Sequence, residues 1–200
     1  NDISVLWANG MGGFPNSLNL PVGVRPIAAA LADLNKDAFM DIVVVNESSD
    51  DMSVLINLGQ GAFEEAKSYK TGDGPTGVIL MDVDDNQLLD ALVTTKNENK
   101  VYVHLGGRKG DFTENIHSAT SSFDTGEAPV ALVSVNIDGD RYVDLLVSNE
   151  ASSTVQILHG DGSSVFGSRS STTSVEEPGQ IISGKIDDNE STDVAVLNTK

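Results

Sequence analysis

The chain has 200 residues, 39% of them hydrophobic, which suits one globular domain that can bury a core. Thirty acidic residues against twelve basic ones give a net charge of −18, and the scattered basic residues argue against binding to nucleic acid or to anionic membranes. The absence of cysteine excludes disulfides, and no apolar run approaches the ~20 residues of a membrane-spanning helix. Because the chain opens on Asn1 without a signal-peptide pattern, we interpret it as a segment whose targeting signal is not present.

Short strands and turns alternate along the whole chain. The first run, 4–14, reads SVLWANGMGGF and joins an alternating strand to a Gly-rich turn that ends in Phe. The runs that follow are four to nine residues long and often β-branched: PIAAALADL (26–34), DIVVVN (41–46), MSVLIN (52–57) and AFEEAKSY (62–69). No stretch sustains the 3.6-residue period of a helix. The sequence therefore predicts an all-β fold.

The same pattern recurs four times. The segment DLNKDAFMDIVVV is repeated with starts at residues 33, 82, 136 and 185, and a proline precedes each start by seven residues: Pro26, Pro75, Pro129 and Pro178. Gly-rich turns ending in Phe follow at 53–63, 101–112 and 155–166, and the fourth turn is the one at 4–14. This fixed order of features predicts an internal repeat of about 50 residues.

A unit of this size with about four strands is typical of one blade of a β-propeller. We therefore expect a single β-propeller domain over 1–200, with repeat units of about 15–63, 64–112, 113–166, and 167–200 together with 1–14. Because the chain begins at the third strand of a unit and ends after the second, we expect strands from both termini to complete one blade and close the ring. The alternative is a piece of a longer array of blades.

The Gly-rich turns, the spaced prolines and the Asp-rich loops resemble the FG-GAP/VCBS repeat family, whose blades also form the heads of integrin alpha subunits. This resemblance covers essentially the whole chain. It implies a calcium-binding β-propeller, usually extracellular, in proteins of adhesion or glycan binding. The chain departs from the family where glycine is favoured at loop positions 4 and 6: these are Lys36 and Ala38, Asp85 and Gln87, then Gly139 and Arg141.

The acidic segments have the spacing of a cation-binding loop. Side-chain oxygens at positions 1, 3, 5 and 9, with a backbone carbonyl at position 7, resemble the first part of an EF-hand loop, and calcium takes about six to eight oxygens. The predicted ligands, each seventh position through its carbonyl, are Asp33, Asn35, Asp37, Phe39 and Asp41; Asp82, Asp84, Asn86, Leu88 and Asp90; and Asn136, Asp138, Asp140, Tyr142 and Asp144. The alternative is solvated Asx-turns without an ion.

The fourth segment differs at its first position. Lys185 stands where a ligand is expected and leaves a weaker set behind it: Asp187, Asn189 and Asp193, with the carbonyl of Ser191. Because a lysine ammonium repels a divalent ion, we predict that this loop is metal-free or weak. About three calcium ions are therefore expected, with a structural role in pinning the turn between the two inner strands of each blade.

No constellation of residues indicates catalysis, so we predict that the protein is not an enzyme. The three histidines, His104, His117 and His159, are interpreted as surface or strand-edge residues, and Trp7 as a packing residue. The predicted function is a calcium-binding extracellular or cell-surface scaffold for a protein or glycan ligand. A structural module of a large adhesin or filament, a domain of a polysaccharide-processing enzyme, and self-association into a larger ring remain as alternatives.

Overall fold

A computed structural model describes residues 1–113, 122–161, 166, 170–189 and 191–199. The described elements are all strands. Among the described residues, there is no helix long and apolar enough to cross a membrane. The predicted all-β fold is confirmed. The predicted site residues all lie within the described ranges, whereas His117 falls outside them.

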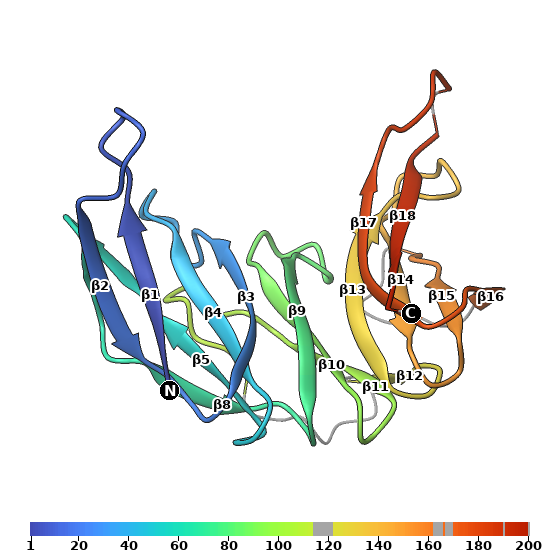
Figure 1. Cartoon of the computed structure of the whole chain (residues 1–200), viewed down its shortest axis with the longest axis horizontal. Helices are drawn as coiled ribbons and strands as arrows, with labels where there is room; N and C mark the ends of the chain where they lie inside the picture. The colour runs from blue at the N-terminus through green and yellow to red at the C-terminus, as the bar shows by residue number, and fades with distance from the viewer. Residues whose placement is uncertain (114–121, 162–165, 167–169, 190, 200) are drawn as a thin grey trace.

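Three four-stranded antiparallel sheets form the body of the molecule (Figure 1). Sheet 1 contains β3 (Pro26–Ala32), β4 (Asp41–Asn46), β5 (Asp51–Leu55) and β8 (Lys67–Lys70). Sheet 2 contains β9 (Pro75–Met81), β10 (Asp90–Thr95), β11 (Lys100–His104) and β12 (Ser122–Asp124). Sheet 3 contains β13 (Pro129–Val135), β14 (Asp144–Asn149), β15 (Thr154–Leu158) and β16 (Ser170–Ser174). Each sheet begins at one of the repeated prolines and takes its fourth strand from beyond the Gly-rich turn.

Three smaller sheets complete the described fold. β1 (Asp2–Trp7) pairs with β2 (Asn16–Pro21), and β17 (Pro178–Gly184) pairs with β18 (Asp193–Asn198). The third is a short hairpin of β6 (Asn57–Gly59) and β7 (Ala62–Phe63), which forms the Gly-rich turn of sheet 1.

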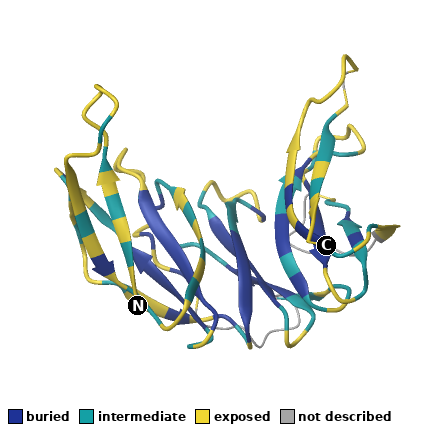
Figure 2. Cartoon of the chain, viewed as in Figure 1, coloured by how far each residue is buried: buried dark blue, intermediate teal, exposed yellow. Residues whose placement is uncertain are grey.

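The sheets stack face to face in an arc and bury a separate core at each junction (Figure 1). Val43 of sheet 1 and Val93 of sheet 2 share one core, Leu92 and Leu145 join sheets 2 and 3, and Ile181 packs the last hairpin on sheet 3. The strands β4, β10 and β14 are buried at every residue, because both faces of their sheets are covered (Figure 2). This accounts for the apolar runs at their centres, 42–45, 91–93 and 145–147, which do not alternate with polar residues.

The predicted closure of the ring does not occur in this structure. β1–β2 and β17–β18 remain separate two-stranded sheets at opposite ends of the arc, rather than one blade (Figure 1). The physical reason is that the core between each pair of sheets sets the angle between them, and the sheets between the two ends do not turn far enough to bring β1 beside β18. Both end sheets are correspondingly more exposed than the three sheets between them (Figure 2).

Candidate metal centres

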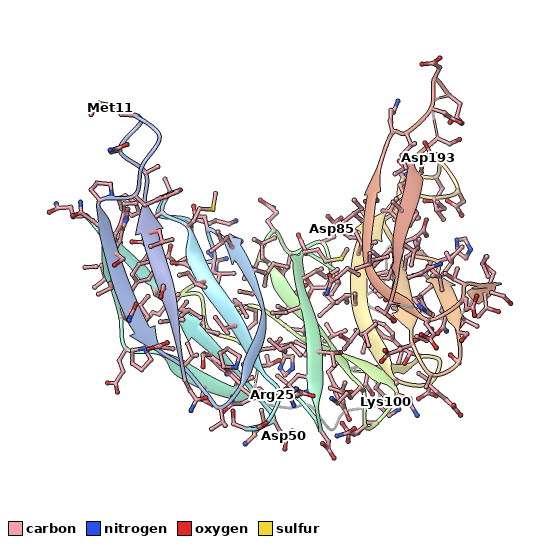
Figure 3. All side chains as sticks on the ribbon, in the orientation of Figure 1. Met11, Arg25, Asp50, Asp85, Lys100 and Asp193 are labelled. Atoms are coloured by element: carbon pink, nitrogen blue, oxygen red, sulfur yellow. The ribbon has the colours of Figure 1, made fainter. Side chains whose placement is uncertain are left out.

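The four acidic segments connect the first strand of a sheet to the second, and we name them loop 1 (33–41), loop 2 (82–90), loop 3 (136–144) and loop 4 (185–193). Loops 2 and 4, marked by Asp85 and Asp193, lie at one end of the strands, whereas Arg25, Asp50 and Lys100 lie at the other (Figure 3). The repeat thus directs its acidic connections to the same side of the arc.

The aspartate at position 9 is fully buried in the three complete sheets. Asp41, Asp90 and Asp144 are each 0% exposed. In loop 2, one oxygen of Asp90 accepts a hydrogen bond from the backbone N–H of Val83 at 2.8 Å, and the other accepts one from Gly106 at 2.7 Å. Loops 1 and 3 repeat this arrangement with the pairs Leu34 and Asn57, and Ile137 and Gly160. This carboxylate therefore links the loop to the end of the third strand.

Burial of these carboxylates disfavours their charged form. Desolvation is the largest cause that raises the pKa of Asp90 to about 6; its backbone hydrogen bonds oppose the shift, and the charges of Asp84 and Asp82 contribute to it. The pKa of Asp41 is raised for the same reasons, with desolvation the largest and Asp37 and Asp33 contributing repulsion. A cation bound beside these groups would offset this cost by favouring the ionised form.

Loops 1 and 2 share the same internal turn. The carboxylate of Asp33 accepts the N–H groups of Asp37 at 3.0 Å and Ala38 at 2.9 Å. Asp82 accepts those of Asn86 at 3.1 Å and Gln87 at 2.6 Å. The loop is thus folded around its first aspartate, as the predicted Asx-turns require. These contacts leave carboxylate lone pairs for an ion, so Asx-turns and cation binding are compatible.

Positions 4 and 6 of these two loops have the conformation that favours glycine, although neither residue is glycine. Lys36 and Ala38 have φ of 65° and 72°, and Asp85 and Gln87 have φ of 62° and 68°. A non-glycine residue in this left-handed region costs on the order of 1 kcal/mol. The two loops therefore keep this turn conformation at a cost in strain. In loop 3, Gly139 has a φ of 78°.

Loop 2 brings its carboxylates together. Asp82, Asp84 and Asp90 each offer an oxygen, and these oxygens all lie within 4.8 Å of one another. Such a cluster of oxygen donors suits a hard divalent cation such as calcium. The carbonyl ligands at Phe39, Leu88 and Tyr142 remain predictions.

In loop 1 the amide of Asn35 donates to Asp37 at 2.9 Å. That carboxylate therefore turns toward its neighbour in the loop. The other oxygen of Asp37 accepts the N–H of Phe39 at 2.8 Å, so both oxygens of this carboxylate are held within the loop.

Loop 3 brings together two of its predicted ligands and one residue that the sequence analysis did not assign. Asp138, Asp144 and His159 offer ligand atoms within 4.8 Å of one another. His159 comes from the end of β15, at the place that Leu105 has in sheet 2 and Ile56 in sheet 1. Its sequence spacing from the aspartates gives no motif, and only the pairing of β14 with β15 reveals the contact. His159 directly follows β15, in agreement with the strand-edge interpretation, but its side chain is only 15% exposed, so it is not a surface residue.

Asn136 and Asp140, the other side-chain ligands predicted in loop 3, make hydrogen bonds within the loop. Asn136 accepts the N–H of Gly139 at 2.8 Å and donates to the carbonyl of Asp140, and the carboxylate of Asp140 accepts the N–H of Tyr142 at 2.7 Å. The amide at position 1 thus folds this loop differently from the aspartate of loops 1 and 2.

In loop 4 the aspartate at position 9 makes the hydrogen bonds within its own loop but not the one to a third strand. One oxygen of Asp193 accepts the N–H groups of Ile186 at 2.7 Å and Asp187 at 3.2 Å. The contact that a third strand makes in the complete sheets has no equivalent, because β17–β18 has two strands, and Asp193 is only half-buried. Asn189 and Ser191 continue the turn.

A groove lies between loops 2 and 3. Its volume is about 450 Å³, and it is lined by polar and aromatic side chains that include Asp82, Asp85, Arg141, Tyr142 and Phe166. The guanidinium of Arg141 lies over the ring of Tyr142 at 4.6 Å from its centroid. Elsewhere, Trp7 packs beside Gly61 of the β6–β7 hairpin, since a side chain on that glycine would meet its ring at 3.2 Å, which supports a packing role.

The fold and the acidic loops together define an all-β repeat module of stacked antiparallel sheets. Residues 33–93, which run from loop 1 to the second strand of sheet 2, match a family described as FG-GAP-like repeat. The resemblance to this family is confirmed over these residues. No curated protein matches the chain in sequence.

Several solved structures share the fold. A functionally unknown protein from Desulfotomaculum acetoxidans DSM 771 matches with a TM-score of 0.59 and 16% identity, over 82% of this chain and 47% of that one. BBS1N, solved in complex with ARL6DN, matches with a TM-score of 0.54 and 16% identity, over 90% of this chain and 52% of that one. The chain thus spans about half the length of these proteins, and at such low identity the likeness shows the fold alone.

Proposed function

We propose that the chain is a binding module whose sheets are held by divalent cations in loops 1, 2 and 3, with calcium the ion that suits the oxygen-only sets of loops 1 and 2. The observation that carries this proposal is the convergence of Asp82, Asp84 and Asp90 on one point. Coulomb repulsion between carboxylates ~4 Å apart is about 4 kcal/mol per pair at an effective dielectric of ~20, and a cation removes it. The FG-GAP-like match over 33–93 supports the same assignment.

Calorimetric titration of calcium into the chelator-treated chain tests this function. We expect saturable binding at loops 1 and 2, and loss of one site in the variant Asp84→Asn. Asp73→Asn is a matched control, because this exposed aspartate lies in the turn before β9, outside the four loops. Calcium heats that are unchanged by Asp84→Asn would contradict the assignment.

The partner of the module is proposed to be a glycan or protein ligand in an extracellular or cell-surface setting, without catalysis. The groove between loops 2 and 3 supports this, because Tyr142 offers a ring face while Asp85 and Arg141 offer hydrogen-bonding groups. Screening of the calcium-loaded chain on a glycan array, beside its Tyr142→Ala variant, tests the site. Glycan binding that survives this substitution would place the ligand elsewhere.

A second proposed function is self-association through the open strand edges. In sheets 1 and 3 the second and third strands pair in the same register, exemplified by Ile42 opposite Leu55. That register would set Val194 of β18 opposite Leu6 of β1. It would also place Asn198 beside Asp2. The equivalent pair in sheet 1 is Asn46 and Asp51, in which the side-chain amide of Asn46 donates a hydrogen bond to the carboxylate of Asp51 at 2.8 Å.

The exposed apolar residues Leu31 and Leu197, at 66% and 60%, support such a junction. They lie on the outer faces of β3 and β18, which a neighbouring sheet would cover. Small-angle scattering with and without calcium, which gives both mass and dimensions, tests it, since pairing between two copies gives a dimer and pairing within one copy gives a compact monomer. An extended monomer under both conditions would contradict pairing of these edges.

A further inference from the structure

The imidazole of His159 meets the carboxylates of loop 3 in a way that no other described loop repeats. Its Nδ1 lies 3.3 Å from an oxygen of Asp138 and 3.5 Å from an oxygen of Asp144. Solvent does not reach this nitrogen, and it has no hydrogen-bond partner among the described residues. The equivalent positions in sheets 1 and 2 hold Ile56 and Leu105, which cannot ligate an ion.

We propose that loop 3 binds a borderline divalent transition-metal ion of the zinc class through His159, Asp138 and Asp144, in place of calcium. The inference rests on the metal-binding function proposed above and assigns a different ion to one of its loops. Calcium is a hard cation that takes oxygen ligands, whereas zinc accepts imidazole nitrogen together with carboxylate oxygen. The ligand set of loop 3 is thus chemically distinct from the oxygen-only set of loop 2.

The distances fit such an ion. Zinc bonds of 2.0–2.1 Å in a tetrahedral arrangement place neighbouring ligand atoms about 3.3 Å apart, close to the two separations from Nδ1. Neither carboxylate has the geometry to form a hydrogen bond with Nδ1 of His159. A metal ion does not need to lie on the line between two of its ligands, so it could bind Nδ1 and both carboxylates together. With three protein ligands, the fourth position is left for water or for a ligand oxygen.

The backbone already orients one ligand. Asp144 is fully buried and accepts N–H groups from Ile137 and Gly160, both at 2.9 Å, so its carboxylate is fixed before an ion binds. Such hydrogen bonds to a ligating carboxylate are the outer contacts that usually tune a metal site. Gly160 follows His159 directly, so the same strand end that supplies the imidazole also holds the aspartate.

The test is titration of Co²⁺, which reports its coordination in the visible spectrum, into the chelator-treated chain, followed by displacement with Zn²⁺. We expect one Co²⁺ site with the absorption of a tetrahedral nitrogen–oxygen set, displaced by Zn²⁺ and retained in millimolar calcium. His159→Leu, which places the residue of sheet 2 at this position, should weaken Co²⁺ and Zn²⁺ binding at least about 100-fold. His104→Leu, a histidine of sheet 2 outside the loops, should leave both unchanged.

Two results would overturn the inference: equal Zn²⁺ affinity in His159→Leu and the unaltered chain, or displacement of the ion by millimolar calcium. Asp138→Asn serves as a second variant, expected to weaken Zn²⁺ while keeping the imidazole. Calcium titration of the same variants separates the two proposals. Calcium binding in loops 1 and 2 without a His159-dependent zinc site refutes only this inference, whereas a zinc site without calcium binding refutes only the calcium assignment.

Discussion

Loops 2 and 4 descend from the same repeated pattern but differ in what surrounds their last aspartate. Asp90 is fully buried and joins the loop to the third strand through Gly106, whereas Asp193 is half-buried and contacts backbone groups of its own loop. The sequence NxxxD at the loop end, 86–90 in loop 2 and 189–193 in loop 4, is common to both. The acidic loop is therefore completed by the third strand of its sheet, so its affinity for an ion and its contribution to stability depend on a neighbour distant in the sequence.

The largest expected effect comes from removing this aspartate. Asp90→Ala leaves the buried N–H groups of Val83 and Gly106 without partners, and we expect a loss of about 2–4 kcal/mol in the free energy of unfolding. Asp193→Ala should cost less than about 1 kcal/mol, because its contacts are exposed to water. Urea denaturation of the chelator-treated variants measures both. Equal losses in the two variants would contradict the stabilising role of the third strand.

The second largest effect is expected from changing the residue at position 1 of loops 2 and 4, which should alter how much calcium stabilises the chain. Asp82→Asn is expected to remove much of the stabilisation by one ion, which is about 2.7 kcal/mol at a hundredfold excess over Kd. Lys185→Asp should add only a weak site to loop 4, because Asp193 lacks the link to a third strand. Calcium-dependent shifts in the urea midpoint measure these effects. A loop 4 variant that binds calcium as tightly as loop 2 would show that the third strand is not required.

His104 is an exception among the complete sheets and offers a smaller test. It lies where Leu55 and Leu158 stand in sheets 1 and 3, is 1% exposed, and neither ring nitrogen has a hydrogen-bond partner among the described residues. Burial lowers its pKa to about 4. We expect His104→Leu to stabilise the chain by about 1–2 kcal/mol at pH 7.

The stabilising effect of His104→Leu should also depend on pH. Because the unfolded histidine titrates near pH 6.5 and the folded one near 4, the unfolded chain takes up the proton first, and stability is lost as the pH falls between these values. The advantage of His104→Leu should therefore grow from pH 7 to pH 5 in parallel urea melts. A constant difference across this range would contradict a buried neutral imidazole.

The smallest predicted effect concerns backbone strain in loop 1. Ala38 has a φ of 72°, and Ala38→Gly should stabilise the chain by about 0.5–1 kcal/mol, as Gln87→Gly should in loop 2. Ala30→Gly is a control in β3, where glycine should destabilise the strand. Stabilisation by the control, or none by Ala38→Gly, would count against the strained turn.

Much of this architecture follows from local sequence. The strands, the position of the acidic loops and the anomaly at Lys185 are visible because each depends on residues close together in the chain. The contact of His159 with Asp138 was missed because it depends on the pairing of β14 with β15. Ring closure was predicted from the spacing of the repeats and is not confirmed, since β1 and β18 stay in separate sheets and the angle between sheets depends on the packing of their cores, such as Val43 against Val93.

The measurement that tests the central claim most directly is thermal unfolding of the unaltered chain in millimolar calcium and in chelator. If cations in the acidic loops hold the sheets, the melting temperature rises with calcium and falls on chelation, by an amount that grows with calcium concentration. A melting temperature that is the same under both conditions would show that the carboxylates of these loops act only through their turns, and would contradict the account.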